Sequence, residues 1–318
     1  MKEILFCDAC KSIEFESLFN NHDRMYGIPG DFTLVQCKCG LVFLNPQPEI
    51  PELKTYYPLA YAPHSLESER GLFHKFILKL EKIYWESHLS LSKIFLFPFC
   101  RFIRGTIIRK NTSMLDIGCG EGSFLQKMKT YGMNVYGLDF SETAVSKARA
   151  KGLNVVHGDL QSQKFPDNHF DLITLHHVLE HLPNPMKTFQ EIRRILKTEG
   201  TLIIDVPNIH SLGFKIFKQY WMPLETPRHL FHFSYRTLMQ YANQTGFKIV
   251  RKSFQSFPSF FLESLFSFLN RNENKPMAEI FSPNSFHLLR ALLLPFSLLT
   301  SWTPWGDSIE IWLKKKHH

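Results

Sequence analysis

A run of glycines after a short apolar segment constrains the fold of this chain more than any other feature. Residues 113–124 read SMLDIGCGEGSF, with glycines at positions 118, 120 and 122. Apolar residues then recur at helical spacing from Phe124 onward. A strand, a tight glycine turn and a helix open a βαβ unit that binds a nucleotide-like cofactor. The glycines let the backbone approach a ligand where a Cβ would clash, so we expect an α/β fold with a ligand at this turn.

The residues around the turn favour one kind of ligand. Ser123 stands where a dinucleotide fingerprint needs a third glycine, and Glu121 at the helix start disfavours a pyrophosphate. Asp116, at the end of the first strand, suits a cationic ligand group better than a phosphate. S-adenosylmethionine (SAM) has no phosphate and carries a sulfonium and an ammonium. These residues therefore favour SAM over a dinucleotide.

We expect four further apolar segments to form strands. They are VYGLDF (135–140), VVHGDL (155–160), FDLITL (170–175) and TLIIDV (201–206). Asp139 ends the second strand of the unit, where an acid takes both ribose hydroxyls. Asp159 follows the third, where a carboxylate can accept from an adenine amino group. Helix signals separate these segments: Ser141 can cap one helix, Asn184-Pro185 can open another, and we expect Gly200 to close it.

The sequence closely resembles the class I SAM-dependent methyltransferases over about residues 111–252. The resemblance rests on Asp116, the glycine turn, Asp139 and Asp159, which follow strand ends in this order. The alternative is a generic doubly wound domain with acids at strand ends by chance. The resemblance implies a doubly wound, mostly parallel sheet of seven strands. FKIVRKS (247–253) would be the sixth strand, and residues 307–315 the last, antiparallel one. It also implies cofactor-binding residues, namely Asp116, Gly118, Cys119, Gly120, Asp139, Phe140, Asp159, Leu160 and His176.

Four of the six cysteines lie in the first 39 residues, as Cys7-x-x-Cys10 and Cys37-x-Cys39. Two close pairs of thiolates can close a tetrahedral, structural zinc site; the alternative is four free buried cysteines. The segment CGLVFLNPQP resembles the zinc-ribbon heads that precede many bacterial methyltransferase domains of surface-polysaccharide clusters. Glu3 and Asp8 interrupt any apolar leader, so we expect no signal peptide and a reducing, cytoplasmic location.

The charge and the apolar segments outside the core point to acidic partners without choosing among them. The formal net charge is +8, which suits nucleic acid, anionic membrane or phosphorylated substrates. Residues 70–110 and 254–300 are rich in Phe and Leu with scattered basic residues, yet too short and interrupted to span a bilayer. They predict amphipathic helices, and we favour a cap over the acceptor site, because aromatic-rich faces are usually buried. The alternative is that these helices rest on the inner membrane surface.

Histidines near the expected carboxyl edge of the sheet are candidates for acid–base chemistry. Methyl transfer to an O–H or N–H acceptor requires loss of a proton, and a near-neutral histidine is a suitable base. His229 is the first candidate and His176 the second; the alternative is a histidine that fixes loop backbone. His177-x-x-Glu180-His181 matches an inverted zinc-protease signature. Because Pro183 ends that helix almost at once, we disfavour a metalloprotease and expect Glu180 and His181 to pack near the cofactor rim.

Together these features predict a zinc ribbon over residues 1–45, a linker and helical cap over 46–110, and a methyltransferase domain over 111–318 with a helical insertion at about 255–305. We expect SAM-dependent methylation of a small-molecule or glycan-type acceptor, on oxygen rather than carbon. Two alternatives are a nucleic-acid (rRNA-type) methyltransferase and a non-catalytic SAM-binding protein. The first is disfavoured because HHVLEH stands where amino-methylating DNA enzymes carry an Asn/Asp-Pro-Pro-aromatic motif. The second is disfavoured by the intact set of acids and glycines.

Overall fold

The computed structural model describes residues 1–58, 111–271, 276–280 and 287–316. The chain divides into two compact units, one of Met1–Pro58 with Leu160–His318 and one of Leu59–Asp159. The helices expected at 70–110, and with them most of the predicted linker and cap, lie outside the described residues.

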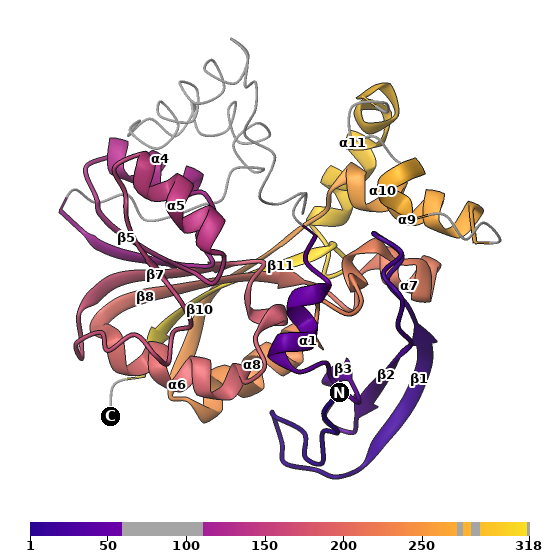
Figure 1. Cartoon of the computed structure of the whole chain (residues 1–318), viewed down its shortest axis with the longest axis horizontal. Helices are drawn as coiled ribbons and strands as arrows, with labels where there is room; N and C mark the ends of the chain where they lie inside the picture. Colours follow the sequence, from indigo (N-terminus) through magenta and orange to yellow (C-terminus); the bar gives the residue numbers. More distant parts are fainter. Residues whose placement is uncertain (59–110, 272–275, 281–286, 317–318) are drawn as a thin grey trace. The chain divides into compact units, whose positions relative to one another are not determined.

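The described part of the unit of residues 59–159, from residue 111 onward, holds three parallel strands and two helices (Figure 1). They are β4 (Ser113–Ile117), α4 (Ser123–Thr130), β5 (Asn134–Asp139), α5 (Glu142–Ala150) and β6 (Asn154–His157). The predicted cap of α5 is confirmed, because the Ser141 hydroxyl accepts a hydrogen bond from the Ala144 amide at 3.3 Å. Strand, glycine turn and helix follow one another as the sequence predicts.

The other unit contributes four strands to the main sheet. They are β7 (Phe170–His176), β8 (Leu196–Pro207), β10 (Phe247–Gln255) and β11 (Ser308–Lys315). β7 and β8 are parallel, whereas β11 runs antiparallel between β8 and β10. Helices α6 (Pro185–Ile195) and α8 (Tyr235–Gln244) pack together, with Phe189 stacked on Tyr241 at 5.6 Å between ring centroids. Ser234 caps α8 through the Thr237 amide.

The main sheet has the strand order β10-β11-β8-β7-β4-β5-β6, which confirms the predicted doubly wound, mostly parallel, seven-stranded methyltransferase fold. One boundary was wrong. Gly200 does not close α6, because the helix ends at Ile195 and β8 already begins at Leu196. The side chain of Leu196 is fully buried, and Leu196 pairs with Phe170 of β7, so burial overrides the polar, turn-like sequence LKTEG.

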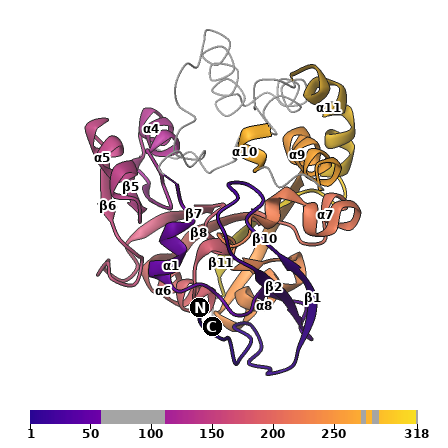
Figure 2. The same ribbon diagram turned by 45° about the vertical axis from the view of Figure 1, so that its right-hand side comes forward.

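The N-terminal segment forms a second, four-stranded sheet of order β1-β2-β3-β9 (Figures 1 and 2). Its first three strands are β1 (Phe15–Asn21), β2 (Phe32–Cys37) and β3 (Val42–Leu44), followed by α1 (Ile50–Thr55). The fourth, β9 (Phe231–His232), comes from the loop after β8, and Phe231 pairs with Phe43 of β3. This pairing joins the N-terminal sheet to the loop after β8 of the same unit.

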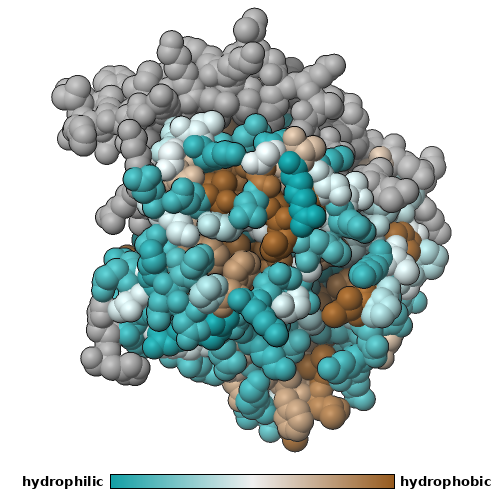
Figure 3. All heavy atoms as spheres, turned by 60° about the vertical axis from the view of Figure 1, so that its left-hand side comes forward, coloured by the Kyte–Doolittle hydropathy of each residue, from teal (hydrophilic) through white to brown (hydrophobic). Residues whose placement is uncertain are grey.

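The described residues between β10 and β11, where the sequence predicts an insertion, form three helices. They are α9 (Pro258–Leu269), α10 (Met277–Ile280) and α11 (His287–Ser301), and both ribbon views place them beside α7 (Leu212–Phe217). Among the described helices, none combines the length and the apolar character that a membrane crossing requires. The face drawn in Figure 3 is mostly hydrophilic, with apolar side chains gathered in a few separate places.

Candidate cofactor and acceptor sites

The glycine turn holds its shape through positive φ angles and one carboxylate. Gly120 has φ +54°, and its amide donates a hydrogen bond to Oδ2 of Asp139 at 2.8 Å. Gly122 has φ +80°, and a Cβ there would lie 2.3 Å from Cδ1 of Leu153. Only glycine therefore allows both the backbone conformation and the packing at Gly122. Next to the turn, Asp139 ends β5 with its carboxylate in a fixed position.

The predicted acids of this unit follow three neighbouring parallel strands. Asp116 lies on β4 and Asp139 at the end of β5; both are buried. Oδ1 of Asp139 also accepts from the Ser141 amide at 2.8 Å, and each carboxylate oxygen keeps a further lone pair for a ligand hydroxyl. Asp159, just after β6, and Phe140 are exposed. The structure thus brings Asp116, the turn and Asp139 together at the carboxyl ends of β4 and β5.

Sequence analysis missed Gly137, which lies in the middle of β5 beneath the turn. A Cβ at this position would lie 2.6 Å from Leu125 Cδ1 and 2.7 Å from Cys119 Sγ. The absent side chain lets α4 and Cys119 pack directly on the strand. The only available signal was a glycine inside the apolar segment VYGLDF, which by itself indicates close approach.

The other two predicted cofactor residues belong to the unit that contains β7. Leu160 and His176 are both buried, and His176 ends β7 opposite Asp205 of β8. The candidate bases lie in this unit too, because the residues after β8 return to the carboxyl end of β7. There the Leu230 amide donates to the carbonyl of Glu180 at 2.8 Å.

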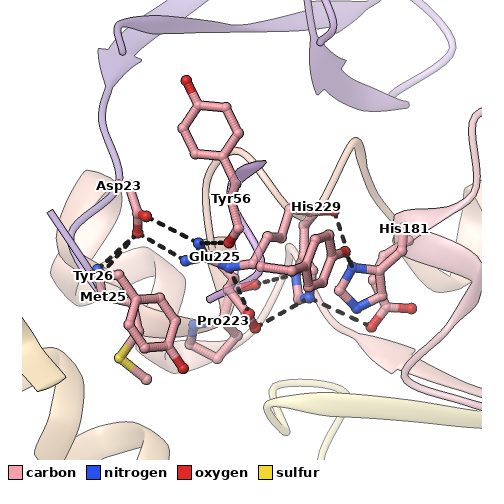
Figure 4. A network of polar contacts seen from close by, with 11 residues as sticks. Asp23, Met25, Tyr26, Tyr56, His181, Pro223, Glu225 and His229 are labelled. Carbon is pink, nitrogen blue, oxygen red and sulfur yellow. Dashed lines mark hydrogen bonds and ion pairs between the residues drawn. The ribbon is translucent and has the colours of Figure 1, made fainter. Parts of the chain in front are cut away.

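A buried arginine organises the loop after β8 (Figure 4). Arg228 is fully buried and forms a bidentate pair with Asp23 of the N-terminal segment, at 2.8 and 3.0 Å. Its Nε donates to Glu225 at 3.0 Å, and Nη1 also donates to the carbonyl of Tyr56. Because the guanidinium fork matches a carboxylate bidentately, the three segments are fixed with respect to one another. Nothing in the local sequence TPRHLFHF indicates that partner.

His229, the first candidate base, is buried beside this arginine. Its Nδ1 lies 2.8 Å from the carbonyl of Pro223, which can only accept, so Nδ1 carries the proton. Its Nε2 faces Oε2 of Glu225 at 3.4 Å and Oε1 of Glu180 at 3.9 Å. Burial, together with the neighbouring His181 and His232, holds the pKa of His229 well below its usual range. The ring is therefore neutral, with the lone pair of Nε2 directed towards two carboxylates.

Glu180 and His181 occupy a short 3-10 helix, η2 (Leu179–His181), after β7. Nδ1 of His181 lies 3.0 Å from the Arg228 carbonyl and 3.0 Å from the Tyr57 hydroxyl. The rings of His181 and His229 meet edge to face, with centroids 4.5 Å apart. His177, with φ +54°, lies between Glu180 at 3.5 Å and Asp205 at 3.6 Å. The segment that resembled a protease signature thus forms a compact histidine–carboxylate cluster.

The four N-terminal cysteines converge. Cys7 and Cys10 precede β1, Cys37 ends β2 and Cys39 opens the following turn. Cys7 Sγ lies 3.7 Å from Cys39 Sγ, and Cys10 Sγ lies 3.4 Å from Cys37 Sγ. All four Sγ atoms lie within 4.8 Å of one another. A tetrahedron with Zn–S bonds of 2.3 Å has edges of about 3.8 Å, so the donor set fits a structural zinc ion.

Comparisons with known proteins agree on the chemistry. The model of a methyltransferase domain family matches residues 95–252. The demethylmenaquinone methyltransferase of Geobacillus stearothermophilus is 29% identical over 190 residues, which cover 56% of this chain and 72% of that protein. The Listeria welshimeri protein of the same name is 32% identical over 126 residues, 36% of this chain and 53% of that one.

Solved structures include a SAM-dependent methyltransferase from Mesorhizobium loti. It is 17% identical and covers 69% of this chain and 97% of its own, with a TM-score of 0.47. The domain match and the methyltransferase relatives, together with the strand order, establish the chemistry. The chain carries a class I methyltransferase domain, and the protein is a SAM-dependent methyltransferase.

Proposed function

We propose that the protein transfers a methyl group from SAM to a hydroxyl of a small-molecule or glycan-type acceptor. The observation that carries this proposal is the buried carboxylate of Asp139, held by the amides of Gly120 and Ser141 at the end of β5. SAM supplies an electrophilic methyl group on its sulfonium. Asp139 would accept the ribose hydroxyls, Asp116 would face the cationic part of the cofactor, and the exposed Asp159 and Phe140 would flank the adenine.

Loss of the acceptor proton is assigned to a histidine of the β7–β8 edge. His229 supports the role with a fixed tautomer, because its Nδ1 donates to Pro223 and leaves Nε2 able to take a proton. His176, buried at the end of β7, is the second candidate. An in-line displacement at the methyl carbon requires an acceptor that can lose its proton, and a neutral histidine can take that proton.

Methyl transfer from isotopically labelled SAM to defined acceptor pools tests the proposal. Nucleotide sugars and lipid-linked saccharides form one pool, a demethylated naphthoquinone a second, and ribosomal RNA a third. We expect label in the first pool, with a ¹³C chemical shift typical of a methyl group on oxygen. Label in RNA alone would support the nucleic-acid alternative, and SAM binding without transfer to any pool would support a non-catalytic protein.

We also propose a zinc ribbon of the surface-polysaccharide-cluster type over the first ~45 residues, with zinc held by Cys7, Cys10, Cys37 and Cys39. The Sγ separations support it. Protein purified without added metal should contain about one zinc per chain at this site, and Cys7→Ser should release it. SAM affinity should persist in that variant, because a closed structural site contributes folding energy alone. Native protein without zinc would contradict the proposal.

We propose further that the enzyme is cytoplasmic and touches an anionic membrane through α11. One stripe of that helix exposes Leu292 (67%) and Leu299 (64%), and Trp302 just beyond it is 70% exposed. Lys215 supports membrane contact, because its Nζ lies 5.1 Å from the centroid of the Trp305 ring and places a positive charge three residues beyond Trp302. The alternative, burial of this stripe by the predicted cap, concerns helices outside the described residues.

Flotation with anionic liposomes distinguishes membrane contact of α11 from burial of its exposed stripe by the cap. Binding that weakens with salt and disappears when Leu292, Leu299 and Trp302 become serine would support membrane contact. SAM affinity serves as the control for folding. Absence of flotation at low salt would refute the membrane proposal and leave the cap.

A further inference from the structure

Glu180 is a buried carboxylate in an unusual environment. Its side chain is 1% exposed, and within the part of the chain that the structure describes, neither oxygen receives a hydrogen bond. A buried charge is strongly unfavourable unless a donor or a cation lies beside it. The nearest ring nitrogens are Nδ1 of His177 at 3.5 Å and Nε2 of His229 at 3.9 Å. Something positive is therefore needed beside Glu180.

His181 and His229, which both lie near Glu180, are arranged to bind a cation. A carbonyl oxygen can only accept, so the contacts of His229 Nδ1 with Pro223 and of His181 Nδ1 with Arg228 place the proton on Nδ1 in both rings. Each neutral ring then offers the lone pair of Nε2. Metal-binding histidines almost always donate their other nitrogen to a carbonyl or carboxylate in this way.

The separations suit a single ion. One ligand atom from each of Glu180, His181 and His229 lies within 4.8 Å of the others. Around an ion with tetrahedral bonds of about 2.1 Å, ligand atoms lie about 3.4 Å apart, so the side chains would need to close by up to about 1.4 Å. Oε2 of Glu225 lies 3.4 Å from His229 Nε2 and offers a further oxygen ligand beside this group.

We propose that Glu180, His181 and His229, with Glu225 beside them, bind one divalent transition-metal ion, separate from the cysteine site. Imidazole and carboxylate ligands together suit Mn²⁺, Fe²⁺, Co²⁺ or Zn²⁺. Its remaining coordination positions would bind the acceptor hydroxyl, a role that rests on the proposed O-methylation. With the ion bound, Nε2 of His229 holds the metal, so the acceptor proton would pass to His176, the second candidate base at the end of β7.

Titration of the full chain with Mn²⁺ alone, followed by the loss of the free-ion electron paramagnetic resonance signal, tests the site. Mn²⁺ prefers oxygen and nitrogen donors, so the four cysteines compete poorly for it. We expect one Mn²⁺ per chain. Glu180→Gln, which keeps the side-chain shape, should weaken binding about 100-fold or more. Glu199→Gln, which removes an exposed acid on β8, is the matched control and should bind as the parent does.

A second variant keeps the test decisive if Glu180→Gln folds poorly. His229→Gln removes a nitrogen ligand and should weaken Mn²⁺ binding to a similar extent. Absence of Mn²⁺ binding by the parent, or binding by both variants equal to that of the parent, would overturn the proposal and leave Glu180 paired with His177 alone.

SAM affinity and methyl transfer are measured on the same samples. A variant that loses Mn²⁺ but still methylates would overturn the acceptor-binding role, whereas parent protein that binds Mn²⁺ but methylates nothing would contradict the proposed function instead.

Discussion

The glycine turn and the loop around Arg228 are both candidate functional regions, but they are built in different ways. The turn is one stretch of 12 residues, from Ser113 to Phe124, completed by an acid at the end of the next strand. Arg228 instead pairs with Asp23, 205 residues earlier, and positions His229 beside Glu180. A local site depends on backbone conformation, whereas an assembled site depends on buried charges drawn from distant segments. The two regions should therefore fail in different ways when they are mutated.

Removal of the buried arginine should have the largest effect. Arg228→Met leaves the carboxylate of Asp23 buried without its partner, so the free energy of unfolding should fall by about 3–5 kcal/mol. Urea unfolding measures the loss, and Arg271→Met, at an exposed position after α9, is the control. A loss below about 1 kcal/mol would mean that the pair behaves as a surface ion pair, and the assembled region would then need another explanation.

The assembled unit should also depend on pH through Asp307. Burial raises the pKa of this carboxyl from its ordinary 3.8 to about 7. Between these values the folded protein keeps a proton that the unfolded chain has lost, so stability falls as the pH rises through this window. Asp307→Asn should therefore be more stable than the parent at pH 8, by on the order of 4 kcal/mol, and similar to it near pH 4.

Denaturant unfolding at both pH values checks the Asp307 prediction. Asp167→Asn, at an exposed acid, should leave the pH dependence of the parent in place. The account would be wrong about Asp307 if the asparagine variant lost stability equally at pH 4 and pH 8, since that would indicate lost hydrogen bonds to Phe257 rather than relief of a buried charge.

The local site should respond to backbone changes instead. Gly122→Ala combines an unfavourable φ of +80° with a Cβ 2.3 Å from Leu153, and should lower the free energy of unfolding by about 2–3 kcal/mol. Gly152→Ala is the matched control, because Gly152 also has a positive φ (+73°) but no atom within 4 Å of an added Cβ. It should cost about 1 kcal/mol. Equal losses in the two variants would show that packing beneath the turn contributes nothing.

The same contrast explains what could be predicted from the sequence. The strands around the turn, the cap Ser141 and the antiparallel last strand follow from local signals, and all are confirmed. The start of β8 at Leu196 could not be predicted, because burial against β7 outweighs a turn-like sequence. Nor could the partner of Arg228, since no local pattern encodes a contact with Asp23.

The histidines show the limit most clearly. His229 could be named as a candidate from its place after the fifth core strand, but its neutral ring and fixed tautomer depend on Pro223, Glu180 and Glu225. The sequence disfavoured a metal at the signature around His177, because Pro183 ends that helix. The contact of His181 with His229 comes only from the fold.

The measurement that tests the central claim most directly is SAM binding by Asp139→Asn, followed by calorimetry. The variant keeps one acceptor for the Gly120 or Ser141 amide but loses the charge that would bind the ribose hydroxyls. Charged hydrogen bonds contribute about 1.5–3 kcal/mol each, so SAM affinity should fall about 100-fold while the fold persists. Glu142→Gln, which removes an exposed acid on α5, should bind SAM as the parent does. Parent protein that binds NAD tightly and SAM not at all would contradict the account.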